Sequence, residues 1–387
     1  MYQNTSKEIF KMSIPMFFEL LLQLLVGNID QIMVSHYSQG SVAAIGNGNQ
    51  IMNIIILVLS SMTVATTVLI SRYFGAGDPE KAKSVSNASI YSLSFFSIVF
   101  TLLIYGFQRP LFQWLQVPND ILDETCSYTV IVSTCILIQA IYMVFASILR
   151  SHKLMKYVTF VAIIMNTLNI LGNAILINGL FGFPRLGIIG AAISTNISKF
   201  IGLVIIILVF LKKTNMGLGF LNLKYFSFKM AKKVLLIAVP SGGEAFSYQM
   251  SQLIILRFVN TFGTMVIASR SYCMILANIA YVYSMAISQA TQILVGYLYG
   301  KGDYESIKKR VWNSVFISMA VSVSLTVIMM FNSNMILGIF TSEQFILDLC
   351  KKILMVEIVL EVGRSINISM VNSLVATGDV NIPVILC

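Results

Sequence analysis

Ten long apolar segments determine what this chain can fold into, because each is long enough to cross a bilayer. A hydrocarbon core needs about 20 apolar residues per helix, and within it only helices or closed barrels satisfy the backbone polar groups. The predicted helices span 8–34, 47–71, 82–106, 121–148, 157–179, 187–211, 230–258, 267–298, 305–331 and 345–375, and an eleventh begins near 381. Segments of this length exclude barrel strands. The sequence therefore predicts an all-α, polytopic membrane protein.

The composition agrees with a membrane protein and excludes several soluble classes. Charged residues make up 11% of the chain, against about 25% in ordinary soluble domains. A soluble enzyme or a disordered chain would need far more charge on its surface. Five cysteines lie in or beside apolar segments without disulfide-type or metal-ligand spacing, which predicts neither a disulfide framework nor a zinc site.

Basic residues are distributed unevenly between the two sides of the predicted helices. Loops on one side carry 18 Lys and Arg residues, and loops on the other side carry 6. Cytoplasmic loops are normally the ones rich in Lys and Arg. We therefore expect a multi-pass protein of the plasma membrane with a cytoplasmic N-terminus. The same distribution accounts for the net charge of +10 without a nucleic-acid partner.

The chain repeats itself at an offset of 225 residues. Six predicted helices separate the copies, so both halves enter the membrane in the same orientation, as in several transporters. The repeated G-x-G-D sequences lack the lysine of a phosphate-binding loop, and we interpret them as tight turns that cap the next helix. The offset pairs Lys7 with Lys232, Pro15 with Pro240, Glu19 with Glu244, and the G-x-G-D sequences at 75–78 and 300–303.

The repeat predicts two pseudo-symmetric bundles, or lobes, of six helices each. The first lobe spans 1–212, a cytoplasmic linker spans 213–229, and the second lobe spans 230–387. A complete second copy would extend about 64 residues beyond Cys387, which corresponds to two helices. We therefore expect this sequence to be a fragment whose second lobe is truncated after ten helices and the start of an eleventh.

Ionisable residues inside the predicted helices are candidate functional groups, because burying them in lipid is expensive. Glu19 and Asp30 are 11 residues apart, about three helical turns, so they share one face of the first helix. Glu244 is the repeat equivalent of Glu19, whereas Asp30 has an isoleucine as its equivalent. Lys199 is interpreted as a counter-ion or a helix-packing residue. The complete set is Glu19, Asp30, Lys199, Glu244, Glu357, Glu361 and Arg364.

A polar stripe lies on the fifth predicted helix, where Asn166, Asn169 and Asn173 are separated by three and four residues. Thr195 on the next helix adds a hydroxyl group. Together with Asp30, these groups can bind Na⁺ or hold a protonated carboxylate. The alternative is that the asparagines form hydrogen bonds between helices, and the residues alone leave both interpretations open.

The tenth predicted helix carries Glu357, Glu361 and Arg364 on one face. Two carboxylates one turn apart repel each other, and an arginine beside them offsets that repulsion. The three residues form either a proton-coupling site or a static ion-pair network that joins two helices. The sequence contains no Ser/His/Asp or Cys/His grouping, so we expect no enzymatic activity.

Five motifs of the chain together resemble the multidrug and toxic compound extrusion (MATE) transporters. The resemblance covers essentially the whole chain, and it implies two six-helix bundles around a V-shaped cavity. It also implies alternation between inward and outward states by exchange of H⁺ or Na⁺. The segments are PMFFELLLQLLVGNIDQIMVSHYSQGSVAAIGNGNQI at 15–51, SRYFGAGDPEKAK at 71–83 with its repeat YLYGKGDYESIKK at 297–309, SILRSHKLMKYVTFVAIIMNTLNILGNAILI at 147–177, LGIIGAAISTNIS at 186–198 and EVGRSINISMVNSLVATGDVNIP at 361–383.

The resemblance implies an ion-coupling site in the first lobe. The positions that family members use there fall on Asp30, Asn169, Asn173 and Thr195, with a proton or Na⁺ at Asp30. Some family members carry Asp at the position of Asn173. Asp30 is consequently the single carboxylate of this set.

The resemblance implies a secondary set of residues in the second lobe. Other family members use a glutamate of the seventh helix, one turn beyond Glu244, where this chain has Tyr248. The acidic group of the tenth helix would be Glu361 or, alternatively, Glu357. Arg364, on the same face, completes the candidates of this lobe.

Taken together, these features predict a secondary active antiporter that exports organic cations or other amphipathic drugs in exchange for H⁺ or Na⁺. We expect no cofactor, no nucleic-acid partner and a monomeric protein. The alternative is a lipid-linked saccharide flippase of the related superfamily, which would require a broad basic cavity, although Lys199 and Arg364 are the bases predicted inside helices. A channel would require a selectivity filter, which the sequence lacks.

Overall fold

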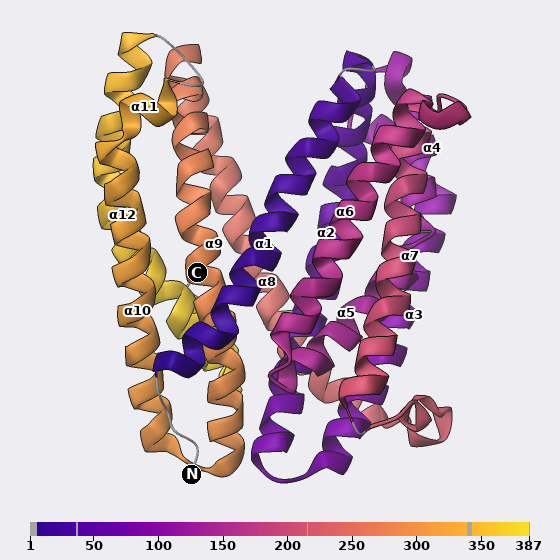
Figure 1. The fold of residues 1–387 in the computed structure, drawn as a ribbon, viewed down its shortest axis with the longest axis vertical. Coiled ribbons are helices and arrows are strands. Elements are labelled where there is room, and N and C mark those ends of the chain that lie inside the picture. Colours follow the sequence, from indigo (N-terminus) through magenta and orange to yellow (C-terminus); the bar gives the residue numbers. More distant parts are fainter. Residues whose placement is uncertain (1–5, 36–37, 215, 339–342, 387) are drawn as a thin grey trace. The chain divides into compact units, whose positions relative to one another are not determined.

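The computed structural model describes residues 6–35, 38–214, 216–338 and 343–386. Every regular element in these ranges is a helix, which confirms the predicted all-α fold (Figure 1). The α-helices are α1 (Ser6–Ser35), α2 (Gln39–Gly75), α3 (Pro79–Trp114), α4 (Asn119–Ser133), α5 (Ile136–Ser151), α6 (Met155–Asn178), α7 (Gly187–Lys213), α8 (Phe228–Asn260), α9 (Thr264–Lys301), α10 (Tyr304–Phe331), α11 (Ser333–Leu337), α12 (Gln344–Thr377) and α13 (Asn381–Leu386). Three short 3₁₀ helices are η1 (Leu180–Gly182), η2 (Gly219–Leu221) and η3 (Leu223–Tyr225).

The length and hydropathy of the helices agree with a polytopic membrane protein. Within the described residues, seven helices are long and apolar enough to cross a membrane, and eight if α4 and α5 together form one span. The long helices α8 and α12 are not among them. These two helices carry the buried or half-buried acidic residues of the second predicted lobe, so their lower hydropathy has a specific cause.

The predicted single helix at 121–148 is wrong in one respect, because α4 and α5 are separate helices bent by 43°. The break frees backbone carbonyl groups that need donors inside a membrane. The side chain of Asn196 on α7 donates to the Ile131 carbonyl at 2.6 Å, and the Thr101 hydroxyl on α3 donates to the Ser133 carbonyl at 3.1 Å. Polar side chains of two neighbouring helices thus stabilise the break.

The described chain divides into two compact units. Unit 1 comprises Met1–Leu21, Gly75–Gly77 and Pro240–Cys387, and unit 2 comprises Leu22–Phe74 and Asp78–Val239. The helices α1 and α8 are each divided between the two units. The lobe boundaries at 212 and 230 stay a prediction, since the units follow spatial contacts and not the repeat.

The repeated G-x-G-D sequences adopt the same turn in both copies. Gly77 and Gly302 have φ angles of 73° and 76°, a left-handed conformation that glycine adopts without strain. The next residues, Asp78 and Asp303, accept hydrogen bonds from the backbone N–H three residues on, at 3.0 and 3.1 Å. Hydrogen bonds from Lys81 lower the pKa of the Asp78 carboxyl, and hydrogen bonds from Ser306 lower the pKa of the Asp303 carboxyl. The interpretation as helix-capping turns is confirmed.

The offset of 225 residues also holds deep inside the two halves. The Thr66 hydroxyl donates to Ser89 at 2.8 Å, and its equivalent Thr291 donates to Ser314 at 2.7 Å. The helices α4 and α12 begin at equivalent positions. Lys153 after α5 and Gly378 after α12 are also equivalent, and both have a positive φ angle. Corresponding positions of the two halves can therefore be compared residue by residue.

The linker that follows α7 packs closely against unit 2. The side chain of Asn87 donates to the Phe220 carbonyl at 2.5 Å, and the Tyr91 hydroxyl donates to another carbonyl of η2 at 2.5 Å. The ring of Phe220 is buried and lies against Phe145 on α5 and Phe210 on α7, with ring centroids 6.4 and 5.7 Å away. The linker therefore completes the aromatic core of unit 2.

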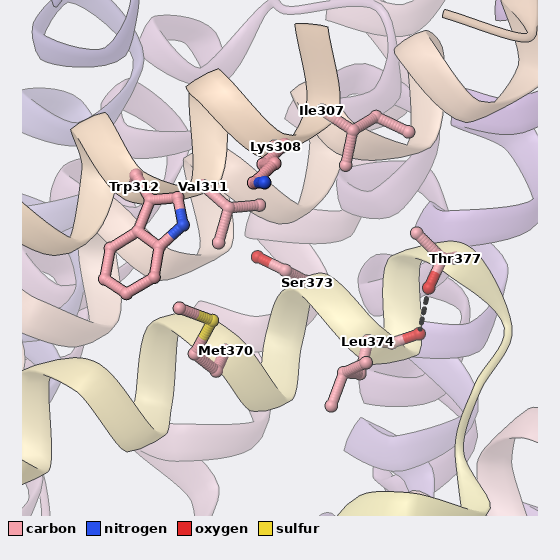
Figure 2. Close-up of a pocket in the computed structure, with 8 residues that line it drawn as sticks. All are labelled: Ile307, Lys308, Val311, Trp312, Met370, Ser373, Leu374 and Thr377. Atoms are coloured by element: carbon pink, nitrogen blue, oxygen red, sulfur yellow. Dashed lines mark hydrogen bonds between the residues drawn. The ribbon is translucent and has the colours of Figure 1, made fainter. Parts of the chain in front are cut away.

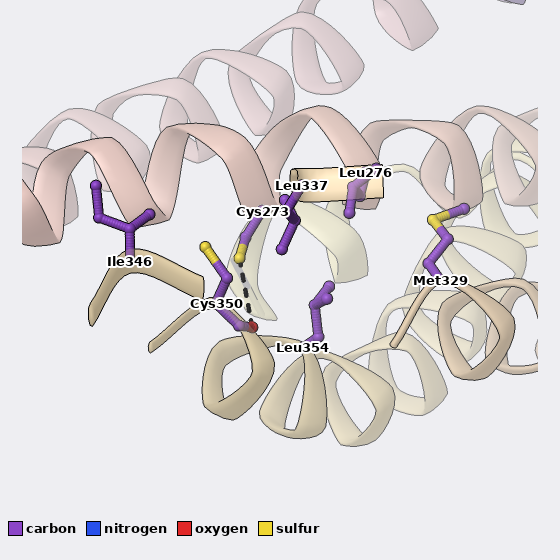
Figure 3. Close-up of a cluster of buried hydrophobic side chains, with 7 residues drawn as sticks. All are labelled: Cys273, Leu276, Met329, Leu337, Ile346, Cys350 and Leu354. Atoms are coloured by element: carbon purple, nitrogen blue, oxygen red, sulfur yellow. Dashed lines mark hydrogen bonds between the residues drawn. The ribbon is translucent and has the colours of Figure 1, made fainter. Parts of the chain in front are cut away.

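In unit 1, the helices α9, α10 and α12 pack side by side (Figure 1). One apolar cluster joins them near the start of α12, as Figure 3 shows. Within it, the Cys273 thiol donates to the Cys350 carbonyl at 3.6 Å, and both cysteines are free thiols. The buried members are Cys273, Leu276, Met329, Leu337, Ile346, Cys350 and Leu354. This cluster fixes the register of the three helices that carry the site described next.

We predict that the close packing of α6 against α7 depends on Gly190. A Cβ atom at Gly190 would lie 2.6 Å from the Leu176 carbonyl oxygen, whereas a Cβ atom at Gly106 on α3 would meet nothing within 4 Å. Alanine gains about 1 kcal/mol of helix propensity over glycine. Gly190→Ala should nevertheless lower the midpoint of thermal unfolding in detergent, while Gly106→Ala should not. Equal midpoints for the two variants would contradict this packing.

Candidate functional site

The ionisable residues of α12 form a compact cluster inside unit 1. Arg364 Nη1 lies 2.8 Å from Glu357 Oε1, and the same atom contacts Glu361 Oε1. Glu361 is fully buried, and Glu357 is 8% exposed. One guanidinium between two carboxylates leaves these three side chains with a formal charge of −1. The predicted clustering of the three residues on one helix face is confirmed.

Hydroxyl groups from three helices extend this cluster into the packed interior. The Ser322 side chain on α10 lies near the Glu361 carboxylate, whose Oε2 atom has no hydrogen-bond partner in the described structure. Ser322 and Ser365 on α12 are 2.9 Å apart between their oxygens, and Ser365 lies 3.4 Å from Ser284 on α9. All three serines are fully buried. The carboxylate of Glu361 is thus connected to a continuous group of side-chain hydroxyls.

The helix α8 contributes Glu244 and Tyr248 on the other side of the cluster. Both residues interact electrostatically with Tyr281 on α9, and so does Arg364. The sequence-predicted residues Glu244, Glu361 and Arg364 therefore belong to one region of unit 1. Glu19 is buried on α1, at 3% exposure.

In unit 2, the structure brings together two of the four residues predicted for the first lobe. The side chain of Asn169 on α6 donates to the Thr195 hydroxyl on α7 at 3.1 Å. Asn173, one turn along α6, is fully buried. Asp30 lies on α1, but its side chain is outside the described part of the chain. The pairing of Asn169 with Thr195 is a hydrogen bond between helices, and the coupling role of the set stays a prediction.

Lys199 lies half-buried on α7, within a helix that is apolar enough to span a membrane. It forms no salt bridge with any of the side chains that the structure describes. Its predicted role as a counter-ion or packing residue therefore stays a prediction.

Metal binding was predicted only as a Na⁺ site at Asp30, whose side chain is not described. Among the described residues, no group of three or more His, Cys, Asp or Glu side chains is arranged to hold a metal ion. In unit 1 the oxygen atoms around Glu361 come mainly from serines. A site made of one carboxylate and hydroxyl groups suits a proton or a weakly bound monovalent cation better than a divalent metal.

Sequence reasoning missed the serines that surround Glu361. A signal was present, because serines recur every four residues in α10 and α12 and therefore share a helix face. Two such stripes say nothing about which serine faces which carboxylate. That pairing depends on the register between α10 and α12, which the buried apolar clusters fix.

Breaking the ion cluster should destabilise the protein. Arg364→Met leaves two neighbouring carboxylates without their shared cation, which costs on the order of 3 kcal/mol for a buried pair. Lys352→Met, an exposed change on the same helix, should stay within about 0.5 kcal/mol. Adding Glu361→Gln to Arg364→Met should recover part of the loss. Thermal unfolding in detergent tests this order, and an Arg364→Met midpoint equal to that of Lys352→Met would contradict it.

Comparisons with known proteins agree with this architecture. The sequence model of the MatE family matches residues 15–175 and 240–387. The uncharacterized transporter YisQ of Bacillus subtilis is 34% identical over 97% of this chain and 83% of its own length. The probable multidrug resistance protein NorM of Thermotoga maritima is 25% identical over 98% of this chain and 82% of its own length.

Solved structures show the same fold. The crystal structure of MATE in complex with MaD5 superposes with a TM-score of 0.89 at 21% sequence identity, and it covers 98% of this chain and 85% of that chain. Together with the helical architecture and the family match on both halves of the repeat, these similarities establish that the chain belongs to the MatE family of membrane transporters.

Proposed function

We propose that the protein is a secondary active antiporter that exports organic cations or other amphipathic compounds in exchange for H⁺ or Na⁺. The observation that carries this proposal is the buried cluster on α12, in which Glu357 and Glu361 share the single cation Arg364. A transporter that holds a net negative charge in its apolar interior has a place for one further cation. Its relative NorM of Thermotoga maritima is named a probable multidrug resistance protein, which supports the same substrate class.

Coupling follows from competition for this negative charge. A proton or Na⁺ at Glu361 would neutralise the cluster, and the hydroxyls of Ser322 and Ser365 can donate to or accept from the occupant. A cationic substrate attracted by the same charge would bind more weakly once the ion is present. Transport additionally requires that the ion stabilise one conformation more than the other, because equal affinity shifts no equilibrium.

The first lobe contains the primary candidate for the residue that exchanges the coupling ion. Asp30 would exchange the proton or Na⁺, and Asn169, Asn173 and Thr195 would shape its surroundings. The described hydrogen bond between Asn169 and Thr195 supports this set, because it holds both polar groups in place across α6 and α7.

We place the N-terminus and the 213–229 linker on the cytoplasmic side of the plasma membrane, as the distribution of Lys and Arg indicates.

The flippase alternative is supported less well. A pyrophosphate-bearing substrate needs several basic groups free to bind it. Arg364 is engaged by two carboxylates, and Lys199 is the other base predicted inside a helix. The exporter therefore accounts better for the charges that the structure describes.

The proposed antiport is tested by ethidium efflux from vesicles that contain the purified protein. We expect efflux when a pH gradient or a Na⁺ gradient is imposed, and the effective gradient identifies the coupling ion. Vesicles without protein serve as the control for leakage. Absence of efflux under both gradients, in protein that retains its helical circular dichroism, would contradict the antiporter.

The roles of the two acidic sites are separated by single substitutions. Asp30→Asn should abolish drug resistance in cells without reducing the amount of protein in the membrane. Glu361→Gln should reduce gradient-driven efflux at least tenfold, because it removes the negative charge that attracts the ion. Glu305→Gln, on an exposed carboxylate at the start of α10, should leave efflux unchanged. Resistance at the unmodified level in Asp30→Asn would remove Asp30 from the mechanism.

A further inference from the structure

Two stripes of serine face each other inside unit 1, at a spacing of four residues that places each stripe on one helix face. All of these serines are buried, with side chains between 0% and 5% exposed. The stripe on α10 is Ser314, Ser318 and Ser322, and the stripe on α12 is Ser365, Ser369 and Ser373. We name these six residues the serine column.

The register of α10 and α12 determines which serines of the two stripes lie opposite each other, and we call each such pair a level of the column. The helices α10 and α12 run in opposite directions, since Met329 packs with Leu354 at one end and Val315 packs with Ala376 at the other. Ser322 and Ser365 form the first level, 2.9 Å apart and next to Glu361. One turn further along both helices gives Ser318 with Ser369, and another turn gives Ser314 with Ser373. A turn rises about 5.4 Å, so the three levels extend over about 11 Å.

The middle level contains two hydroxyl groups without a hydrogen-bond partner in the described structure. The side-chain oxygens of Ser318 and Ser369 are fully buried and have no partner. The other levels are bonded, for instance through the hydrogen bond from Thr291 to Ser314 at 2.7 Å. A buried hydroxyl without a partner costs free energy, and folded proteins commonly satisfy such groups with internal water.

The repeat supplies a built-in comparison for this column. At the equivalent positions of unit 2, Leu93 replaces Ser318, Val144 replaces Ser369 and Ile136 replaces Glu361, whereas Ser89 and Ser97 stand at the positions of Ser314 and Ser322. These three apolar side chains are buried, at 0%, 0% and 3% exposure. The same helix arrangement is thus built in unit 2 with large apolar side chains. Packing of small residues between helices therefore does not account for the hydroxyl groups of Ser318 and Ser369.

The column ends at a cavity at the far end of α12. The cavity has a volume of about 220 Å³ and lies between α10 and α12. Figure 2 shows the Ser373 hydroxyl on the side of α12 that faces Lys308 and Val311 of α10. The pocket is partly open and lined mostly by apolar side chains, and Lys308, Ser373 and Thr377 are the polar groups that can hold water in it. The serine column therefore connects Glu361 with a space at the Lys- and Arg-rich end of α10.

We propose that the serine column holds a chain of water molecules that carries protons between Glu361 and this cavity. The proposal rests on the proposed antiport and names a proton route for it. Protonated Glu361 gives its proton to the nearest water or hydroxyl, each following oxygen passes one proton on, and the last water delivers one to the aqueous side. Atoms and charge balance without an oxidant or a further reactant.

The charged and titratable groups around Glu361 determine on which side of this residue the proton leaves. On α12 these groups are Glu357 and Arg364. Tyr281 on α9 and Tyr248 on α8 interact electrostatically with Arg364, and Glu244 on α8 interacts with Tyr281. The helix α10 places Ser322 near Glu361, and it also carries the buried Arg310 one turn beyond Ser314, on the face of the serine stripe. The six serines themselves carry no charge, so a proton leaves Glu361 along them and reaches the aqueous side before Arg310.

Water in the column is tested by deuterium exchange of introduced thiols, which requires no transport. In a chain whose native cysteines are replaced by alanine, Ser318→Cys and Ser369→Cys are compared with Val315→Cys. Val315 is a matched control, because it is 1% exposed on the same helix but lies in an apolar cluster. After transfer to D₂O, the infrared S–H bands of the two column variants should vanish at least ten times faster. Equal rates in all three variants would overturn the proposal.

Proton transfer is tested with Ser318→Ala plus Ser369→Ala, which removes both hydroxyls without adding bulk. Efflux driven by a pH gradient should fall at least tenfold, while the Kd for ethidium and the midpoint of thermal unfolding stay unchanged. Val315→Ala is the control. Unaltered efflux in the double variant would overturn the proton route. Failure of the unmodified protein to respond to a pH gradient would instead contradict proton antiport itself, a result independent of the thiol exchange.

Discussion

Hydrocarbon offers no hydrogen bonds, and this constraint governs every polar group inside the helices of this protein. The break between α4 and α5 persists because Asn196 and Thr101 donate to carbonyls beside it. The two carboxylates of α12 persist because Arg364 lies between them. In both places, side chains from within the same unit replace the solvent. Where polar groups are needed inside the described helices, their hydrogen-bond partners come from neighbouring helices.

Much of the fold is readable from the sequence, because apolar segments of spanning length and a long repeat leave few alternatives. The face shared by Glu357, Glu361 and Arg364 also follows from helical spacing alone. The break at 134–135 does not, since no proline or glycine lies near it and its stability comes from α3 and α7. Long-range partners of this kind depend on tertiary register, which a local pattern does not contain.

The candidate site likewise has features that the sequence predicts and features that depend on tertiary register. The residues of α12 that carry charge were predictable, whereas the proximity of Ser322 to Glu361 was not, because these residues lie on different helices and 39 positions apart in the chain. Comparison of the two halves distinguishes the helix arrangement, which they share, from the polarity of the side chains, which differs. Ile136 and Glu361 occupy equivalent places, and so do Leu93 and Ser318. The two halves share the helix arrangement, and at these positions the second half has polar groups where the first half has an apolar core.

The docked linker has a consequence for the order in which the chain folds during synthesis. Phe220 is part of the aromatic core of unit 2, although it lies after the last helix of the first repeat. That core cannot close until Phe220, seven residues beyond the end of α7, has left the ribosome, and until then the Asn87 amide and the Tyr91 hydroxyl lack the carbonyls to which they donate. The first half of the protein therefore reaches its final packing only after synthesis of the second half has begun.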